Sequence, residues 1–267
     1  MPPLSDIGYS HDACIAVVRD YYSFLTKMYL DEAEVIEPPD GGWPSLATTA
    51  VAEDLGKTAT VVSLLRHIPY IRDPFDRSEQ AQGGPWCYFA DWQALVQLLA
   101  NGGATSEDLR VSSESPYLFE AVPPHVVGLT HGPRDTPVFL LDTKLGVVYW
   151  VECPGAIRYS PTRALVEDDA YDYAPENEAE WRADAAAWAI ADFFAVLKDQ
   201  YRDLHFIPLN SRTVVDVYAT LSHGSDGMVE MLQKIYRDHG WPNLERYRKR
   251  ECMEAIRIAL EENYPDY

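Results

Sequence analysis

Two apolar runs near the middle of the chain decide the fold class: Pro137-Val-Phe-Leu-Leu-Asp142 and Gly146-Val-Val-Tyr-Trp-Val-Glu152. Both are rich in β-branched and aromatic residues, which favour strands. Only Thr143-Lys144-Leu145 separates them, and a link of that length fits a hairpin turn. The two runs therefore predict an antiparallel hairpin at about residues 137–152. Val126 to Thr130 and Ala156 to Tyr159 are predicted to add edge strands.

Most of the remaining chain is predicted to be helical. The longest amphipathic stripe extends over about residues 178–204 and predicts a long helix on which the hairpin packs. Ser10 and Asp91 stand directly before apolar stripes of helical spacing and are candidate N-caps. After the segment 205–209 the chain is predicted to be helical again, at about 211–221, 226–239 and 243–263.

These elements predict an α+β fold, mostly helical, with a small central antiparallel sheet. The sequence has neither the βαβ alternation nor the GxGxxG motif of a dinucleotide-binding fold. We find no internal repeat and no linker, so residues 1–267 are predicted to form a single domain, with 205–267 as a candidate helical subdomain. Arg72 to Pro85 is polar, ends in Gly-Gly-Pro, and is the candidate mobile loop.

The net charge of the chain argues against two classes of partner, nucleic acids and anionic membranes. The chain has 22 basic and 42 acidic residues, a formal net charge of −20. Binding to nucleic acid or to an anionic membrane surface requires a local excess of Lys and Arg, so neither is expected. An aromatic content of 12% indicates a folded domain and not a disordered acidic segment.

The termini and the cysteines indicate the compartment. The first residues lack the basic and apolar regions of a signal peptide, and no apolar stretch approaches the roughly 18 residues of a membrane span. The four cysteines are scattered, which predicts reduced, buried thiols in the cytoplasm, with the nucleus as the alternative. No histidine or cysteine spacing matches a metal site, so we expect neither a metal nor a cofactor.

Acidic residues are densest between residues 163 and 184, where only Arg163 and Arg182 oppose them. Carboxylates at this density favour an interaction face for a protein that carries a basic patch. The predicted acidic interaction face consists of Glu167, Asp168, Asp169, Asp172 and Glu176.

An enzyme of an unrecognised type is the alternative. The chain lacks the GxSxG and GxxxxGK[ST] motifs, so any catalytic group would belong to a pocket between the aromatic cluster 86–92 and the hairpin. Cys153 could be a nucleophile at a strand end, although a packed thiol is the commoner use. The polar candidates are His131, Asp142, Tyr149 and Glu152. The candidate pocket-lining residues are Trp43, Trp86, Tyr88, Trp92 and Trp150, for which core packing is again the commoner use.

The hairpin resembles that of the SMI1/KNR4 (SUKH) superfamily, in which a strand ending in Leu-Asp leads through a turn into Gly-x-Val-Tyr-x-Trp-like residues. Phe193-Phe194-x-x-Leu197 resembles the helix that follows it, and Asn101-Gly-Gly103 resembles a turn of that family, although no Pro-x-x-Tyr precedes it. Gly41 to Pro44 and Arg66 to Ile71 are similar to uncharacterised proteins of filamentous fungi. The resemblance implies an α+β fold and a non-catalytic, protein-binding role, as in bacterial immunity proteins and fungal regulators of cell-wall synthesis.

Three functional hypotheses follow. The first is a regulatory module that binds a basic protein partner through its acidic face. The second is the enzyme with a pocket beside the hairpin. The third, a DNA-mimicking inhibitor, is disfavoured because the carboxylates are concentrated in one segment. The sequence leaves the oligomeric state open.

Overall fold

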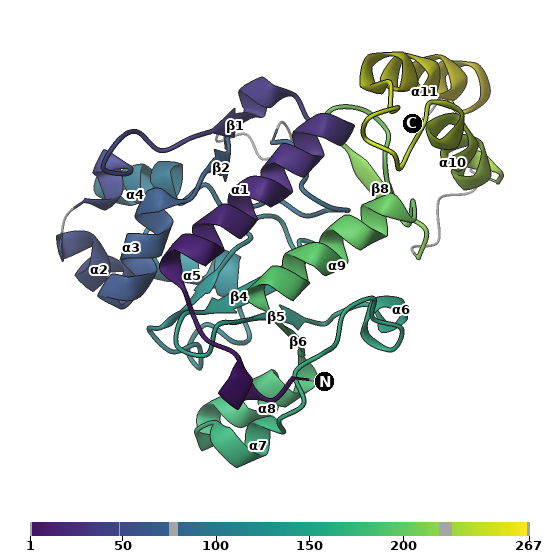
Figure 1. Ribbon diagram of the computed structural model, residues 1–267. Coiled ribbons are helices and arrows are strands. Elements are labelled where there is room, and N and C mark those ends of the chain that lie inside the picture. The colour runs from purple at the N-terminus through teal and green to yellow at the C-terminus, as the bar shows by residue number, and fades with distance from the viewer. Residues whose placement is uncertain (1, 48, 75–79, 219–225, 266–267) are drawn as a thin grey trace.

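A computed structural model describes residues 2–47, 49–74, 80–218 and 226–265 and confirms the α+β class (Figure 1). The α-helices are α1 (His11–Met28), α2 (Thr49–Leu55), α3 (Ala59–His67), α4 (Trp92–Ala100), α5 (Ser106–Glu114), α6 (Gly155–Arg158), α7 (Ala170–Tyr173), α8 (Glu176–Asp184), α9 (Ile190–Arg202), α10 (Met228–Asp238) and α11 (Lys249–Asn263). The strands are β1 (Val35–Ile36), β2 (Tyr70–Ile71), β3 (Val126–Gly128), β4 (Val138–Asp142), β5 (Val147–Val151), β6 (Ala186–Ala189), β7 (Phe206–Pro208) and β8 (Val214–Asp216).

The predicted hairpin forms the centre of a four-stranded antiparallel sheet of order β3-β4-β5-β6. Val138 pairs with Val151 at one end of the hairpin and Asp142 with Val147 at the other. The turn is stabilised by its own side chain, since Asp142 Oδ1 accepts hydrogen bonds from the N–H groups of Lys144 (2.8 Å) and Leu145 (2.9 Å). Gly146 closes the turn at φ +75°, where a residue without a side chain is unstrained.

Both faces of this sheet are buried, which explains why its strands read as nearly continuous apolar runs. On one face Phe139 packs edge-on against Trp150 of β5 and Phe193 of α9, each with 4.9 Å between ring centroids. The opposite face belongs to a second apolar cluster with Trp181 and Ala185, against which Leu4 and Ile7 of the N-terminal segment pack. In Figure 1, α1 and α9 lie above the sheet, and α7, α8 and the N-terminal segment lie below it.

The prediction of one helix over residues 178–204 is wrong. The chain leaves α8 at Ala185, forms β6 on the edge of the sheet, and begins α9 at Ile190. Four consecutive residues of β6 pair with β5, from Ala186 opposite Trp150 to Ala189 opposite Val147. Completing the sheet in this way outweighs the helical propensity of the alanine-rich segment. The prediction that the hairpin packs on this segment is confirmed for both helices: α9 contacts it through Phe193, and α8 contacts it through Trp181, whose ring centroid lies 5.2 Å from that of Tyr149.

Other predicted elements also differ from the structure. Residues 156–159 do not form an edge strand, because α6 begins directly after Pro154. The helix expected at 211–221 is replaced by β8, which pairs with β7, and residues 219–221 lie outside the described ranges. The last helix begins at Lys249 and not at residue 243. Helix α5 was not predicted, although its capping box, formed by Thr105 and Asp108, is visible in the sequence.

The candidate mobile loop is in part a core element. Residues 75–79 of it lie outside the described ranges. Gln80, Ala81 and Gln82, in contrast, are buried, and the Gln80 side-chain amide donates to the carbonyls of Ile71 (3.2 Å) and Phe89 (2.9 Å). The predicted N-caps are confirmed: Ser10 accepts from Ala13 N–H and Asp91 from Ala94 N–H. Among the described residues, no helix combines the length and the apolarity that crossing a membrane requires.

The C-terminal helices are joined to the first helix by polar contacts. Lys249, at the start of α11, donates from Nζ to the carbonyls of Thr26 (2.7 Å) and Leu30 (2.6 Å) at the end of α1. Tyr247 donates from its hydroxyl to the carbonyl of Met28 (2.8 Å). These donors satisfy carbonyls that the helix end leaves unpaired. Lys249 belongs to a cluster of basic residues, Arg246, Arg248, Lys249 and Arg250, and through these bonds it has a structural role.

Gly128 in β3 offers a test of how closely α5 approaches the sheet. A Cβ atom at this position would collide with the Ser113 backbone of α5, whereas a Cβ at Gly8 would meet nothing within 4 Å. We expect Gly128→Ala to lower the free energy of unfolding by about 2 kcal/mol or more, and Gly8→Ala to have little effect. Urea denaturation of both variants measures the difference, and equal midpoints would contradict the packing.

Asp91 predicts a pH dependence of stability. Burial is the main cause that raises its pKa to about 6, and the Ala94 and Asp73 N–H groups oppose the rise only in part. Because the folded state holds this proton more tightly than the unfolded chain, the contribution to stability is complete below about pH 4 and is lost as the pH rises through 6.

Asp91→Asn retains the N-cap and removes the titration. We expect the difference in unfolding free energy between wild type and variant to change by up to about 3 kcal/mol between pH 4 and 7. Chemical denaturation at a series of pH values measures it. Parallel stability curves for the two proteins would show that Asp91 titrates normally.

Candidate functional site

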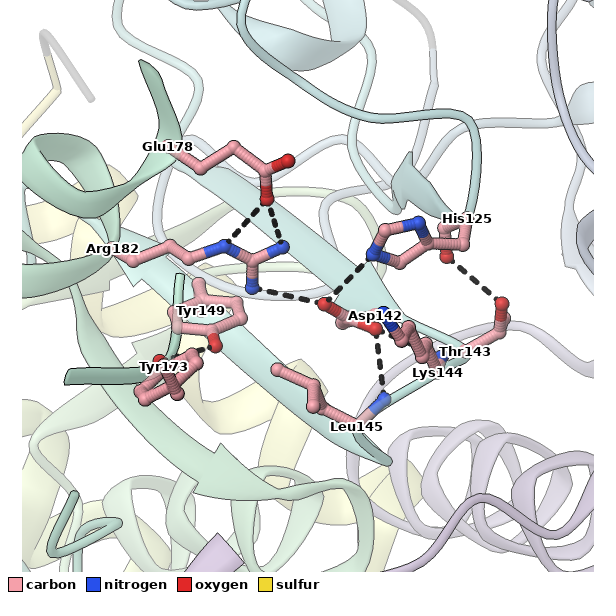
Figure 2. A network of polar contacts seen from close by, with 9 residues as sticks. All are labelled: His125, Asp142, Thr143, Lys144, Leu145, Tyr149, Tyr173, Glu178 and Arg182. Carbon is pink, nitrogen blue, oxygen red and sulfur yellow. Dashed lines mark hydrogen bonds and ion pairs between the residues drawn. The ribbon is translucent and has the colours of Figure 1, made fainter. Parts of the chain in front are cut away.

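A buried ionic network lies at the turn end of the hairpin, on the face that α8 covers (Figure 2). Arg182 of α8 donates from Nη1 to Asp142 Oδ2 at 2.9 Å. Its Nε and Nη2 both donate to Glu178 Oε2, at 3.0 and 2.8 Å. The side chain of Asp142 is 0% exposed and that of Arg182 is 2% exposed. His125 Nε2 lies 3.6 Å from the same Asp142 oxygen.

Aromatic rings complete the surroundings of Arg182. Its guanidinium carbon lies 4.9 Å from the ring centre of Tyr149 and 4.6 Å from that of Trp181. The Tyr149 hydroxyl is 2.9 Å from that of Tyr173 in α7. One arginine thus connects the hairpin turn, β5 and α8, and Tyr149 extends the connection to α7 (Figure 2).

The network favours the ionised forms of its acid and its base. Burial opposes ionisation of Asp142, but His125, Arg182 and the Leu145 N–H together outweigh it and lower the pKa of this carboxyl. Burial likewise opposes the charge on Arg182, but Tyr149, Asp142 and Glu178 raise its pKa further above the ordinary value. A charge-assisted, doubly bonded arginine of this kind is a rigid structural element.

A hollow of about 420 Å³ opens beside this network, between β6 and the segment that precedes α7. Its wall includes three tyrosines, Tyr149, Tyr171 and Tyr173, together with Ala185 at the end of α8 and Ala186 and Ala187 of β6. The same wall carries three carboxylates of the predicted acidic interaction face, Glu167, Asp168 and Asp169, and two arginines, Arg158 and Arg182. The volume lies within the range of small-ligand sites.

All five residues predicted for the acidic interaction face are exposed: Glu167, Asp168, Asp169, Asp172 and Glu176. Two of them are oriented by backbone donors. Asp168 Oδ2 accepts from Leu4 N–H at 2.6 Å, and Asp169 Oδ1 accepts from Tyr171 N–H at 3.0 Å. Glu178 belongs to the same acidic stretch of sequence but is buried on Arg182. The Glu178–Arg182 spacing of four residues on a helix could have indicated that pair.

The structure does not bring the four polar candidates of the enzyme hypothesis together. Asp142 and Tyr149 share the Arg182 network, whereas Glu152 is exposed at the opposite end of the hairpin, roughly 16 Å from Asp142 along the strands. His131 is buried beyond β3, also at that opposite end, with its N–H bonded to the Tyr88 carbonyl (2.9 Å). Asp142 and Glu152 therefore do not form a carboxylate pair.

The aromatic candidates also lie apart. Trp43 donates to the Ile68 carbonyl (2.9 Å) and Trp92 to the Gly128 carbonyl (3.0 Å), so both are buried anchors of the core. Trp150 packs on Phe139, Tyr88 is half-buried, and Trp86 is 54% exposed. The cavity between Phe89, Trp92 and Leu129 measures only about 10 Å³, room for one water molecule at most.

The remaining sequence candidates are structural. Burial raises the pKa of the Cys153 thiol to about 12, which disfavours a thiolate nucleophile. Among the described residues, no three His, Cys, Asp or Glu side chains are grouped so that they could hold a metal ion.

Comparison with known proteins yields no relative. No family model, no curated protein and no solved structure matches this chain.

The Arg182 network predicts a large effect of a single substitution. Arg182→Met retains much of the side-chain volume but leaves two buried carboxylates without their cation, so we expect a loss of about 3–5 kcal/mol in unfolding free energy. The control is Arg257→Met, which removes an exposed arginine paired with Glu254 and Glu261 and should cost less than about 1 kcal/mol. Urea denaturation compares the two, and similar losses would contradict the structural role of Arg182.

Proposed function

We propose that this chain is a protein-binding module whose acidic face docks a basic patch on a partner protein. The observation that carries the proposal is the exposure of Glu167, Asp168 and Asp169 around one hollow, with Asp172 and Glu176 following in the same segment. Within the described ranges, neither a hydrogen bond nor an ion pair engages the side-chain oxygens of Glu167, Asp172 or Glu176. Asp172 and Glu176 stand in the first turns of α7 and α8, where a carboxylate is favourable, but Glu167 has no such position, and the repulsion among like charges at this density supports a binding role.

The net charge of −20 supports the same class of partner. A strongly negative surface accelerates association with a basic protein and repels nucleic acid and anionic membranes. The buried Arg182 network holds α8 against the hairpin, and the contact between Tyr149 and Tyr173 links this network to α7. The segment that carries the acidic interaction face is therefore attached to firmly positioned helices. Rigid positioning reduces the entropy that binding must overcome.

We further propose an SMI1/KNR4-like regulatory role in the cytoplasm or nucleus. This rests on the resemblance of the hairpin and of the helix that contains Phe193 and Phe194. In the structure these two elements pack directly against each other through Phe139 and Phe193.

Charge reversal tests the proposal. The protein is immobilised and used to capture proteins from a lysate of its source cells at about 0.05 M and about 0.3 M salt. We expect wild type to retain basic proteins at the lower salt, and Asp168→Lys/Asp169→Lys to lose them. The matched control, Glu230→Lys/Glu262→Lys, changes the same charge at exposed positions on α10 and α11 and should retain them.

Thermal unfolding of each variant confirms that it is folded before capture is compared. Retention of the same proteins by all three forms, or retention that salt does not alter, would contradict the acidic face as the docking site.

A further inference from the structure

We infer that the hollow beside the Arg182 network is a socket for an arginine side chain of the partner. This inference rests on the proposed function, which it extends from a face to a single recognised group. The hollow combines three features that a guanidinium requires: uncompensated carboxylates, flat aromatic rings and an apolar surface for the side-chain stem.

The charges of the wall favour a cation. Its two arginines are already engaged within the chain: Arg182 by Asp142 and Glu178, and Arg158 by the carbonyls of Ala183 and Asp184. Arg182 is neutralised by its two carboxylates, so the wall carries the charges of three acidic residues against that of Arg158 alone. A cation entering the hollow meets Glu167, Asp168 and Asp169, all on its wall and all exposed.

Two of these carboxylates are oriented before any partner arrives. Asp168 and Asp169 each use one oxygen to accept a backbone N–H, from Leu4 and Tyr171 respectively. Within the part of the chain that the structure describes, their other oxygens, Asp168 Oδ1 and Asp169 Oδ2, accept no hydrogen bond. Carboxylates held in this way bind a charged donor with a smaller loss of side-chain entropy.

The tyrosines favour arginine over lysine. Tyr171 is 64% exposed at the hollow, and Tyr173 is half-buried in its wall. A planar guanidinium stacks on such rings and donates two parallel hydrogen bonds to a carboxylate, whereas an ammonium does neither. The chain already contains one guanidinium held by the same chemistry, since Arg182 lies over Tyr149 and bonds to two carboxylates.

The volume of the hollow and the apolar residues in its wall also fit an arginine side chain. About 420 Å³ accommodates a long side chain together with the neighbouring backbone of the partner. Leu165, Val166 and the alanines at 185–187 provide apolar surface against which the methylene stem of an arginine can lie.

Binding of short peptides tests the socket. Two fluorescein-labelled peptides are used, Gly-Ser-Arg-Gly-Arg-Gly-Ser and its counterpart with lysine in place of arginine, at about 0.15 M salt. Fluorescence polarisation measures affinity, and tyrosine-ring NMR signals identify the contact. We expect the arginine peptide to bind about tenfold tighter and to shift the signals of Tyr171 and Tyr173.

Two variants and one control locate the binding. Asp168→Asn/Asp169→Asn keeps an acceptor for each backbone N–H and removes both charges, and Tyr171→Ala removes an exposed ring. Each should weaken binding of the arginine peptide by about tenfold. Glu230→Gln/Glu262→Gln removes the same charge elsewhere on the surface and should change affinity by less than about twofold.

Equal affinity for the two peptides, equal weakening by the control, or no binding of the arginine peptide would overturn the socket. If charge reversal at Asp168 and Asp169 still abolishes capture of basic proteins in that case, the acidic face remains as the docking surface and only the socket is wrong. If capture is also unaffected, both the socket and the proposed function are wrong.

Discussion

The buried guanidinium of Arg182 is the constraint on which the placement of α7 and α8 against the sheet depends. Removing an arginine from water costs several kcal/mol, and this burial persists because Asp142, Glu178 and two aromatic rings surround the charge. Asp142 also organises the hairpin turn through the Lys144 and Leu145 N–H groups. One interaction therefore joins the turn of the sheet to α8. The acidic interaction face and the hollow lie beside α7 and α8, and this connection holds those two helices in place.

The sheet imposes a second constraint because it is covered on both faces. The segments that cover the sheet therefore bring their backbones close to its strands and turns. A side chain on Gly146 would come within 2.6 Å of the Gly8 backbone, where the N-terminal segment crosses the hairpin turn. The same segment then reaches Asp168 through Leu4 N–H. The first residues of the chain therefore help to orient a carboxylate of the acidic face, although 164 residues separate them in sequence.

Sequence reasoning predicted the α+β class, the hairpin, the N-caps at Ser10 and Asp91, and most helices, because each depends on neighbouring residues. It failed at β6, where the strand is stabilised by pairing with β5 more than thirty residues earlier. It also identified which carboxylates form an acidic segment but not that Glu178 would be buried away from them. The hollow could not be predicted, because its wall combines β5, β6, α7 and α8.

By itself the sequence determined the local structures and the sign of the surface charge. The turn, the caps and the amphipathic stripes arise from hydrogen bonds and side-chain spacing within a few residues, and composition alone sets the net charge. Only the tertiary structure decided which charges became structural and which stayed exposed. Whether a side chain is buried depends on which segments, often distant in sequence, pack over it. Arg182 and Glu178 are therefore part of the interior, while Asp168 and Asp169 lie at the surface.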